Sequence, residues 1–255
     1  MKKGIKEKTI VISQPYFFPW LGMFEQINIA DVFVYYDDVQ FTKGHFQDRV
    51  QIKTSKGFNW LTVPKAGLKL GQKIQEVKID YKKDWRHSHV ELIKQSLNKT
   101  PFLDDVLVIV ECVYSEKYNY LADLTIASTD IVLDYFNLKE KKQMLRSSCL
   151  NISGTSTDKV LSICKSLDAT TYATGMGALK YFDFDLFEKE NITVKFIDYA
   201  KIPYQQQFDG FNPYVSILDL IANKGPEGIE FFKSKLIYWK DFIKTNEAKE
   251  YLKKG

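Results

Sequence analysis

Two short apolar runs, separated by a loop and a helical stretch, constrain the fold most at the N-terminal end of this chain. Residues 9–13 (TIVIS) and 31–36 (DVFVYY) are each typical of a buried strand. Between them, Pro19 marks the start of a helix, because its fixed φ suits a first helical turn. A strand, a helix and a second strand in this order favour parallel pairing of the two strands.

The rest of the chain continues this alternation, with a different pattern in its middle. Residues 49–64 hold two alternating runs joined by Ser55-Lys56-Gly57, which is a hairpin signal. Residues 85–136 follow helical spacing and are divided by Pro101. Further strands are expected at 74–79, 144–149, 170–178 and 192–200, and further helices at 154–167, 214–222 and 225–237.

These patterns predict an α/β fold with a Rossmann-like parallel sheet core, an antiparallel patch and a helical middle segment. We expect a single domain over residues 1–255, within which about residues 85–140 could be a helical insertion. With 45% apolar and 15% aromatic residues, the chain can bury a sizeable core.

Charge and cysteine content exclude several functional classes. The net charge is +4, from 36 basic and 32 acidic residues, and the lysines are scattered, so we expect no nucleic-acid binding, whereas an anionic small substrate fits. Three cysteines without a CxxC motif predict reduced thiols. The N-terminal apolar run is too short for a signal peptide, and no run could span a bilayer. The sequence thus predicts a cytoplasmic protein without membrane contact and leaves a homodimer open.

The loop that follows the first strand is unusually rich in rings. Residues 13–26 (SQPYFFPWLGMFEQ) carry little charge, although surface loops are normally polar. Either this loop is buried or it forms the wall of a pocket. We predict a ring-lined wall whose ligand-binding side chains are Gln14, Tyr16, Phe17, Phe18 and Trp20.

Other polar loops should meet this wall, because ligands of open α/β sheets bind outside the carboxyl ends of the strands. The second strand ends in Asp37-Asp38, and a later one ends in Gly175-Met-Gly177. Within residues 35–49, a carboxylate or an imidazole could accept a proton, while amide and basic groups could bind substrate. The alternative is a solvated loop with surface ion pairs. The candidates are Asp37, Asp38 and His45 for catalysis, and Gln40, Lys43, Arg49, Gly175 and Gly177 for binding.

Residues 153–159 (SGTSTDK) resemble an anion cradle at the start of a helix, where backbone N–H groups and the helix dipole favour a phosphate. The Walker spacing is absent, and an ordinary Ser/Thr helix cap is the alternative. The binding candidates in this segment are Ser153, Thr155, Thr157 and Lys159.

Two more polar segments have less specific patterns. Residues 203–225 place three glutamines and two aromatic residues before a helix, so Gln205 is a candidate for binding a sugar or nucleotide, with a plain connecting loop as the alternative. His87 and His89 lie two apart on an expected helix, without a third ligand, so we predict no metal site.

Several of these stretches together resemble the WbqC-like protein family. The resemblance runs from about residue 10 to 230 and rests on the strings QPYFFPWLGMFEQI, ADVFVYYDDVQFTKGHFQDRVQIKT, WLTVP, WRHSH, SSCLNISGTSTDKVLSIC, YATGMGALKYFD and YQQQFDGFNPYVSILDLIANKG. Where the family pattern has Asn-Arg-Asn, this chain has Asp48-Arg49-Val50, which puts a role for the two flanking positions in doubt.

The resemblance implies a setting in bacterial surface-polysaccharide (O-antigen or capsule) biosynthesis and a nucleotide-linked deoxyamino sugar as substrate. We expect transfer of an acyl or aminoacyl group, for example glycyl, to the sugar amine. ATP or an activated acyl donor is the open choice of co-substrate. The alternative is a non-catalytic nucleotide-sugar-binding or scaffold protein.

The first strand-loop-helix unit also resembles the opening of pantothenate synthetase, which implies a nucleotidyl-transferase-like fold. That family carries HxGH at the start of the helix. Here residues 19–23 read PWLGM, so Gly22 is kept and both histidines are missing. Adenylation by the usual residues is therefore not expected.

Overall fold

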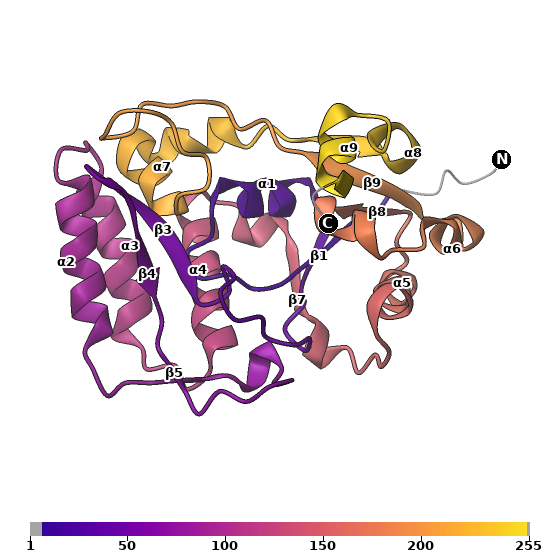
Figure 1. Ribbon diagram of the computed structural model, residues 1–255, viewed down its shortest axis with the longest axis horizontal. Helices are drawn as coiled ribbons and strands as arrows, with labels where there is room; N and C mark the ends of the chain where they lie inside the picture. Colours follow the sequence, from indigo (N-terminus) through magenta and orange to yellow (C-terminus); the bar gives the residue numbers. More distant parts are fainter. Residues whose placement is uncertain (1–6, 254–255) are drawn as a thin grey trace.

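A six-stranded sheet forms the centre of the computed structural model, which describes residues 7–253 (Figure 1). Its strand order is β10-β9-β8-β1-β2-β7, and every neighbouring pair is parallel except β10 with β9. The structure confirms a mixed α/β fold with a mostly parallel sheet. The strands are β1 (Thr9–Ser13), β2 (Val32–Tyr35), β7 (Gln143–Arg146), β8 (Thr171–Thr174), β9 (Thr193–Asp198) and β10 (Lys235–Tyr238).

Helices cover both faces of this sheet, because alternate strand residues point to opposite sides. Val11 of β1 packs into the larger core cluster, whereas its neighbours Ile10 and Ile12 pack into a second cluster on the other face. The first face carries α1 (Leu21–Ile29), α4 (Leu121–Tyr135) and α7 (Ile217–Lys224). The same core cluster continues away from the sheet into α2 (Trp85–Leu97) and α3 (Leu103–Ser115), which pack against β3, α4 and α7 (Figure 1). The second face is covered by α5 (Ser156–Ser166) and α6 (Phe184–Lys189).

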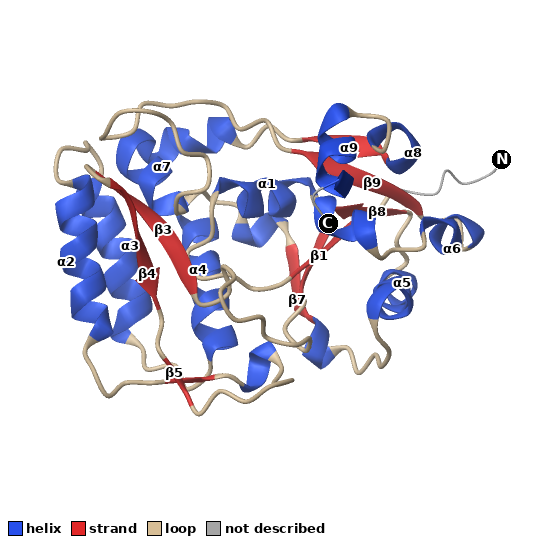
Figure 2. Ribbon diagram, in the orientation of Figure 1, coloured by secondary structure: helices blue, strands red, loops and turns tan. Residues whose placement is uncertain are grey.

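The antiparallel patch lies at the end of the molecule where α2 and α3 pack (Figure 2). The predicted hairpin is confirmed as β3 (Arg49–Thr54) and β4 (Gly57–Thr62). Gly57, in its turn, has a φ of 111°, a conformation that favours glycine. A second small pair joins β5 (Lys65–Ala66) to β6 (Lys78–Ile79).

Four predicted elements differ from the structure. The strands expected at 144–149 and 170–178 end earlier, at Arg146 and Thr174, and a 3₁₀ turn follows each of them. Residues 74–79 were expected to form a strand, but Ile74–Glu76 is a 3₁₀ turn and only Lys78–Ile79 is extended. The helix expected at 225–237 is a 3₁₀ segment, Gly225–Phe231, followed by β10, because Ile237 pairs with Phe196 of β9. The short helices α6, α8 (Trp239–Phe242) and α9 (Asn246–Lys253) had no clear sequence signal.

The strand order determines where loops can meet. The chain runs from β1 outward through β2 to β7, and then returns to β8 on the other side of β1. The carboxyl ends of β1 and β8 therefore flank the point where the order reverses, which is the usual ligand crevice of open α/β sheets. No helix within residues 7–253 is long and apolar enough to cross a membrane.

Candidate functional site

A cleft at the carboxyl ends of β1, β2, β7 and β8 has two adjoining compartments. The first, which we call the aromatic compartment, has a volume of about 780 Å³ and is bordered by Gln14, Tyr16, Trp20, Gln26, Tyr36, Thr42, His45, Phe46, Tyr172, Thr174, Gly175, Gly177 and Tyr181, among others. The second, the serine compartment, has about 720 Å³ and is bordered by Asp38, Gln40, Lys73, Ser147, Ser148, Asn151, Ser153, Gly154, Thr155 and Lys159, among others. Tyr36, Val39 and Ser156 border both.

The loops that were predicted to converge do so in the aromatic compartment. Gln14 and Tyr16 follow β1, and Gly175 and Gly177 follow β8. Among the described residues that border this compartment, none is an aspartate, glutamate, lysine or arginine, and one, His45, is a histidine. It is therefore suited to an uncharged ring with polar substituents, next to a single proton acceptor.

A chain of side-chain amides fixes Gln14 at the cleft. The Nε2 of Gln47 donates to the Oε1 of Gln14 at 2.7 Å, and the backbone N–H of Thr42 donates to the Oε1 of Gln47 at 2.9 Å. Gln47 is fully buried, so this contact is shielded from water. The Oε1 of Gln14 is thus engaged, and its amide nitrogen is the group it can offer to a ligand.

The tyrosines of the aromatic compartment are neutral hydrogen-bonding groups at physiological pH. Burial raises the pKa of Tyr16, and burial together with the nearby Asp38 carboxylate raises the pKa of Tyr36. Tyr36 also lies under the ammonium of Lys159, whose Nζ is 5.3 Å from the ring centroid.

In the serine compartment, the first turn of α5 lacks a side-chain cap. Thr155 is the N-cap residue, yet its side chain makes no cap hydrogen bond, so the predicted Ser/Thr cap is absent. Gly154 before it has a φ of 113°, which is a left-handed conformation. The backbone N–H groups of this turn and the helix dipole are thus suited to an anion.

Asp38 and Lys159 form an ion pair at the edge of this compartment. The Nζ of Lys159 donates to the Oδ2 of Asp38, and the hydroxyl of Ser147 donates to the Oδ1 at 2.5 Å. Both charged side chains are largely buried, at 7% and 11% exposure. Asp38 therefore orients Lys159, and its own oxygens are already engaged.

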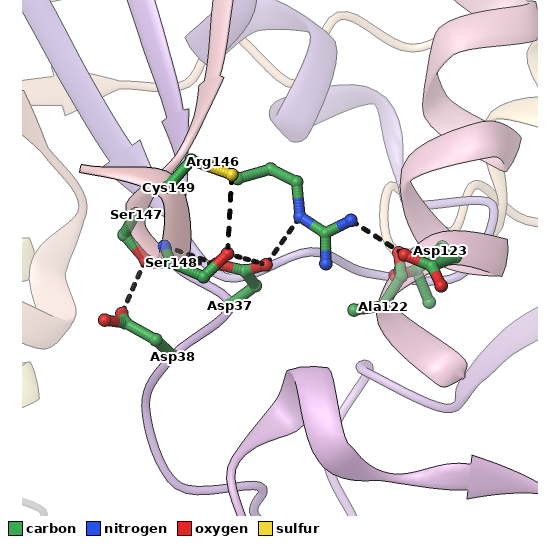
Figure 3. A network of polar contacts seen from close by, with 9 residues as sticks. Asp37, Asp38, Ala122, Asp123, Arg146, Ser147, Ser148 and Cys149 are labelled. Carbon is green, nitrogen blue, oxygen red and sulfur yellow. Dashed lines mark hydrogen bonds and ion pairs between the residues drawn. The ribbon is translucent and has the colours of Figure 1, made fainter. Parts of the chain in front are cut away.

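Asp37 is fully buried behind this pair, where its carboxylate accepts several hydrogen bonds (Figure 3). The Nε of Arg146 donates at 2.7 Å, and Ser148 donates through its backbone N–H at 3.0 Å and its hydroxyl at 2.9 Å. Arg146 also donates to Asp123 at 2.7 Å. Because both oxygens of Asp37 are occupied and shielded, this residue holds the loop after β7 in place.

Comparison with known proteins shows the family of this chain. The WbqC-like protein family matches residues 14–231. The chain belongs to this family. It is 30% identical over 229 residues to an uncharacterized protein of Mycobacterium tuberculosis, a match that covers 89% of this chain and 98% of that protein. No solved structure matches the chain.

Two rings that we expected at the ligand do not reach the cleft of this WbqC-like protein. Phe17 and Phe18 are fully buried in the core, where their ring centroids are 5.0 Å apart. Phe17 packs 5.9 Å from His89, and Phe18 packs 6.3 Å from Tyr114. Of the four rings predicted to form the wall, Tyr16 and Trp20 border the cleft.

Other predicted residues also lie outside the two compartments. The guanidinium of Arg49 is 4.2 Å from the Trp60 ring centroid and donates to the carbonyl of Gly44, so it supports the loop instead of facing the cleft. Lys43 is exposed and borders neither compartment. Thr157 is buried, and its hydroxyl contacts the backbone of Tyr181. Gln205 is exposed beside Lys99, in a separate small depression.

The structure adds residues that sequence reasoning missed in this WbqC-like protein. Tyr36 directly follows β2 and lies between the two compartments. Its position directly after a buried strand is the sequence signal that could have indicated this. Gln26 comes from α1 and Tyr181 from the segment after β8. Within residues 7–253, no group of three or more histidine, cysteine, aspartate or glutamate side chains is arranged to hold a metal ion.

Proposed function

We propose that this WbqC-like protein is a cytoplasmic acyl or aminoacyl transferase, for example a glycyl transferase, of surface-polysaccharide biosynthesis. Its acceptor would be the amino group of a nucleotide-linked deoxyamino sugar. The observation that carries the proposal is the contrast between the two compartments of one cleft. One is aromatic and has no aspartate, glutamate, lysine or arginine among its described border residues, and the other offers the first turn of α5, Lys159 and several hydroxyls.

This contrast supports one orientation of the substrate. The phosphates would lie in the serine compartment, where Lys159 and the backbone N–H groups after Gly154 favour an anion. The sugar would lie across Tyr36 in the aromatic compartment, since rings stack on sugar faces and the amide of Gln14 can bind a hydroxyl. The volumes of the two compartments are in the range of ordinary small-molecule sites.

The aromatic compartment also supports the proposed chemistry. A sugar amine must be unprotonated before it attacks an acyl carbon, and a site without carboxylates does not stabilise the protonated ammonium form. His45, exposed at this compartment, is the group that would take the proton. The amine nitrogen then forms the amide bond to the acyl carbon, and the leaving group of the activated donor departs.

The strand order supports a nucleotidyl-transferase-like core, in which the cleft lies between the ends of β1 and β8, where the strand order reverses. We therefore keep ATP with a free amino acid, or an activated acyl donor, as the second substrate. Because the two histidines of the adenylating families are absent from residues 19–23, the donor would be bound in another way.

The experiment is incubation of the protein with thymidine-linked amino sugars, glycine and ATP, or with acyl coenzyme A, followed by mass spectrometry. We expect a product whose mass has increased by the transferred group. His45→Gln should then reduce turnover by roughly 10²-fold or more with little change in sugar affinity. His87→Gln is the matched control, because His87 is exposed on α2 outside the cleft and should have no effect.

One observation favours a second candidate, a non-catalytic nucleotide-sugar-binding protein. Both carboxylates that the sequence suggested for catalysis, Asp37 and Asp38, are engaged in ion pairs. Binding of a nucleotide-linked amino sugar in calorimetry, without a mass increase for any donor, would establish this candidate and overturn the transferase.

A further inference from the structure

A long irregular segment crosses the molecule between β9 and α7. Residues 199–216, which we call the strap, form neither helix nor paired strand apart from isolated bridges. Figure 1 shows it running from β9, past α1, to the end of the molecule where β3 lies. Irregular segments of this length in compact domains usually serve a function.

The strap contacts two side chains that border the aromatic compartment. The rings of Tyr199 and Tyr214 lie 5.0 Å and 5.4 Å from the ring of Trp20, centroid to centroid. The hydroxyl of Tyr199 also accepts a hydrogen bond from the Nε2 of Gln26 at 2.7 Å. Trp20 and Gln26 both border the aromatic compartment, so the position of the strap determines the position of two cleft residues.

A buried lysine on the hairpin holds this strap. Lys53 of β3 is 5% exposed, and its ammonium donates to the Oε1 of Gln206 at 3.1 Å, to the carbonyl of Phe208 at 2.6 Å and to the carbonyl of Gly210. Among the described residues, no carboxylate lies within ion-pair distance of it. A buried ammonium is costly unless its donors are satisfied, and here the strap satisfies them.

Strand β3 also holds the part of the strap that lies next to Tyr214. The Nδ2 of Asn212 donates to the Oε1 of Gln51 at 3.2 Å, and the backbone N–H of Ser216 donates to the carbonyl of Gln51 at 2.9 Å. The Oδ1 of Asn212 accepts from the backbone N–H of Tyr214 at 2.9 Å. A continuous set of contacts thus leads from β3 to the ring that packs on Trp20.

We propose that Lys53 is a positioning residue of the cleft, which acts through the strap to hold Trp20 in the wall of the aromatic compartment. The consequence for ligand binding rests on the proposed function. The structural link between Lys53 and Trp20 does not, and it is the part that the experiment measures.

The experiment is fluorine NMR of the whole chain with 5-fluorotryptophan at its four tryptophans, the Trp20 resonance being assigned with Trp20→Phe. Lys53→Met should shift or broaden the Trp20 resonance and leave those of Trp85 and Trp239 in place. Lys53→Arg, which keeps the donors, should restore the wild-type resonance. Lys56→Met removes an exposed lysine from the hairpin turn and should change nothing.

Gly22→Ala shows how the Trp20 resonance responds when the Trp20 ring is displaced. A Cβ on Gly22 would lie 2.3 Å from atoms of the Trp20 ring, so Gly22→Ala displaces this ring through a change outside the strap. If Lys53→Met does not fold, Asn212→Ala tests the same link and should also shift the Trp20 resonance, by a smaller amount. A Trp20 resonance unchanged in the folded Lys53→Met or Asn212→Ala protein would overturn the proposal, whether or not any sugar transfer is found.

Discussion

The Oδ2 of Asp37 accepts a hydrogen bond of 2.7 Å from the Nε of Arg146, yet the two side chains differ in burial: Asp37 is fully buried and Arg146 is one-third exposed. Removal of one member of a buried ion pair leaves the other charge uncompensated, at a cost of about 3–5 kcal/mol. We expect Asp37→Asn to lower the free energy of unfolding by about 3 kcal/mol in urea denaturation.

The matched control for this variant is Asp123→Asn. Asp123 accepts from the same guanidinium at 2.7 Å but is 37% exposed, so its loss should cost less than about 1 kcal/mol. Equal losses for the two variants would show that burial does not set the strength of this network. If Asp37→Asn has wild-type stability but no turnover, Asp37 has the catalytic role that its position after β2 suggested.

A second prediction concerns Lys159 and its partner Asp38. If Lys159 binds phosphate, Lys159→Met should weaken binding of a nucleotide-linked sugar by about 10- to 100-fold in calorimetry, the scale of one charge-assisted contact. The single variant also leaves Asp38 unpaired, which could repel an anion by itself. The double variant Asp38→Asn/Lys159→Met separates the two effects. It should bind as weakly as the single variant, whereas restored affinity would mean that Lys159 only neutralises Asp38.

The sequence indicated the positions of the site loops better than the directions of their side chains. Hydrophobic runs and their order were enough to predict a parallel sheet, and hence that Gln14 after β1 and Gly175 after β8 meet at one edge. The burial of Asp37 could not be predicted, because it depends on Arg146 and Ser148, which come more than a hundred residues later.

The two phenylalanines of the opening loop show a second limit. In an extended segment Phe17 and Phe18 would point to opposite sides. In the structure Phe18 has a φ of 37°, and both rings enter the core. No pattern of apolar residues indicates such a backbone conformation at a non-glycine residue, since it is stabilised by contacts such as that of the Phe18 N–H with Ser128.

The third prediction follows from this difference in burial. Phe17→Ala should lower the free energy of unfolding by about 3–5 kcal/mol, as for other aromatic residues in cores. Trp20→Ala, at the cleft, should cost less stability and weaken binding of the nucleotide-linked sugar. Urea denaturation and calorimetry on both variants measure this. A loss of affinity in a folded Phe17→Ala protein, with none in Trp20→Ala, would contradict the assigned wall.

The fourth prediction concerns His89, which is buried and lies 2.8 Å from the hydroxyl of Tyr114 through its Nδ1. Burial lowers the pKa of His89 to about 4, against the ordinary value of 6.5. Between these two pH values the unfolded chain binds the extra proton, so stability falls as the pH falls from about 6.5 to 4. When the pH is lowered from 7 to 4.5, we expect the free energy of unfolding of wild type to fall by about 2 kcal/mol more than that of His89→Gln. An equal loss of stability in both proteins over this range would show that His89 does not titrate as expected.

The last prediction has the opposite sign and concerns Asp219. This carboxylate is fully buried; its Oδ1 accepts from the hydroxyl of Tyr204 at 2.9 Å, and its Oδ2 has no partner among the described residues. Burial raises the pKa of Asp219 to about 6, against the ordinary value of 3.8. The folded chain therefore keeps this proton up to a higher pH than the unfolded chain does. As a result, the free energy of unfolding falls as the pH rises from about 4 to 6 and stays low above about pH 6.

Asp219→Asn keeps an oxygen for Tyr204 and removes the ionisation. The free energy of unfolding of Asp219→Asn minus that of wild type should therefore be about 2–3 kcal/mol larger at pH 8 than at pH 4. Urea denaturation at both pH values measures this difference. Asp209→Asn, in the exposed part of the strap, is the control and should show no such change. If the difference between Asp219→Asn and wild type is the same at both pH values, the Asp219 carboxylate ionises at its ordinary pKa. Its buried Oδ2 must then be solvated or paired in a way that offsets its burial.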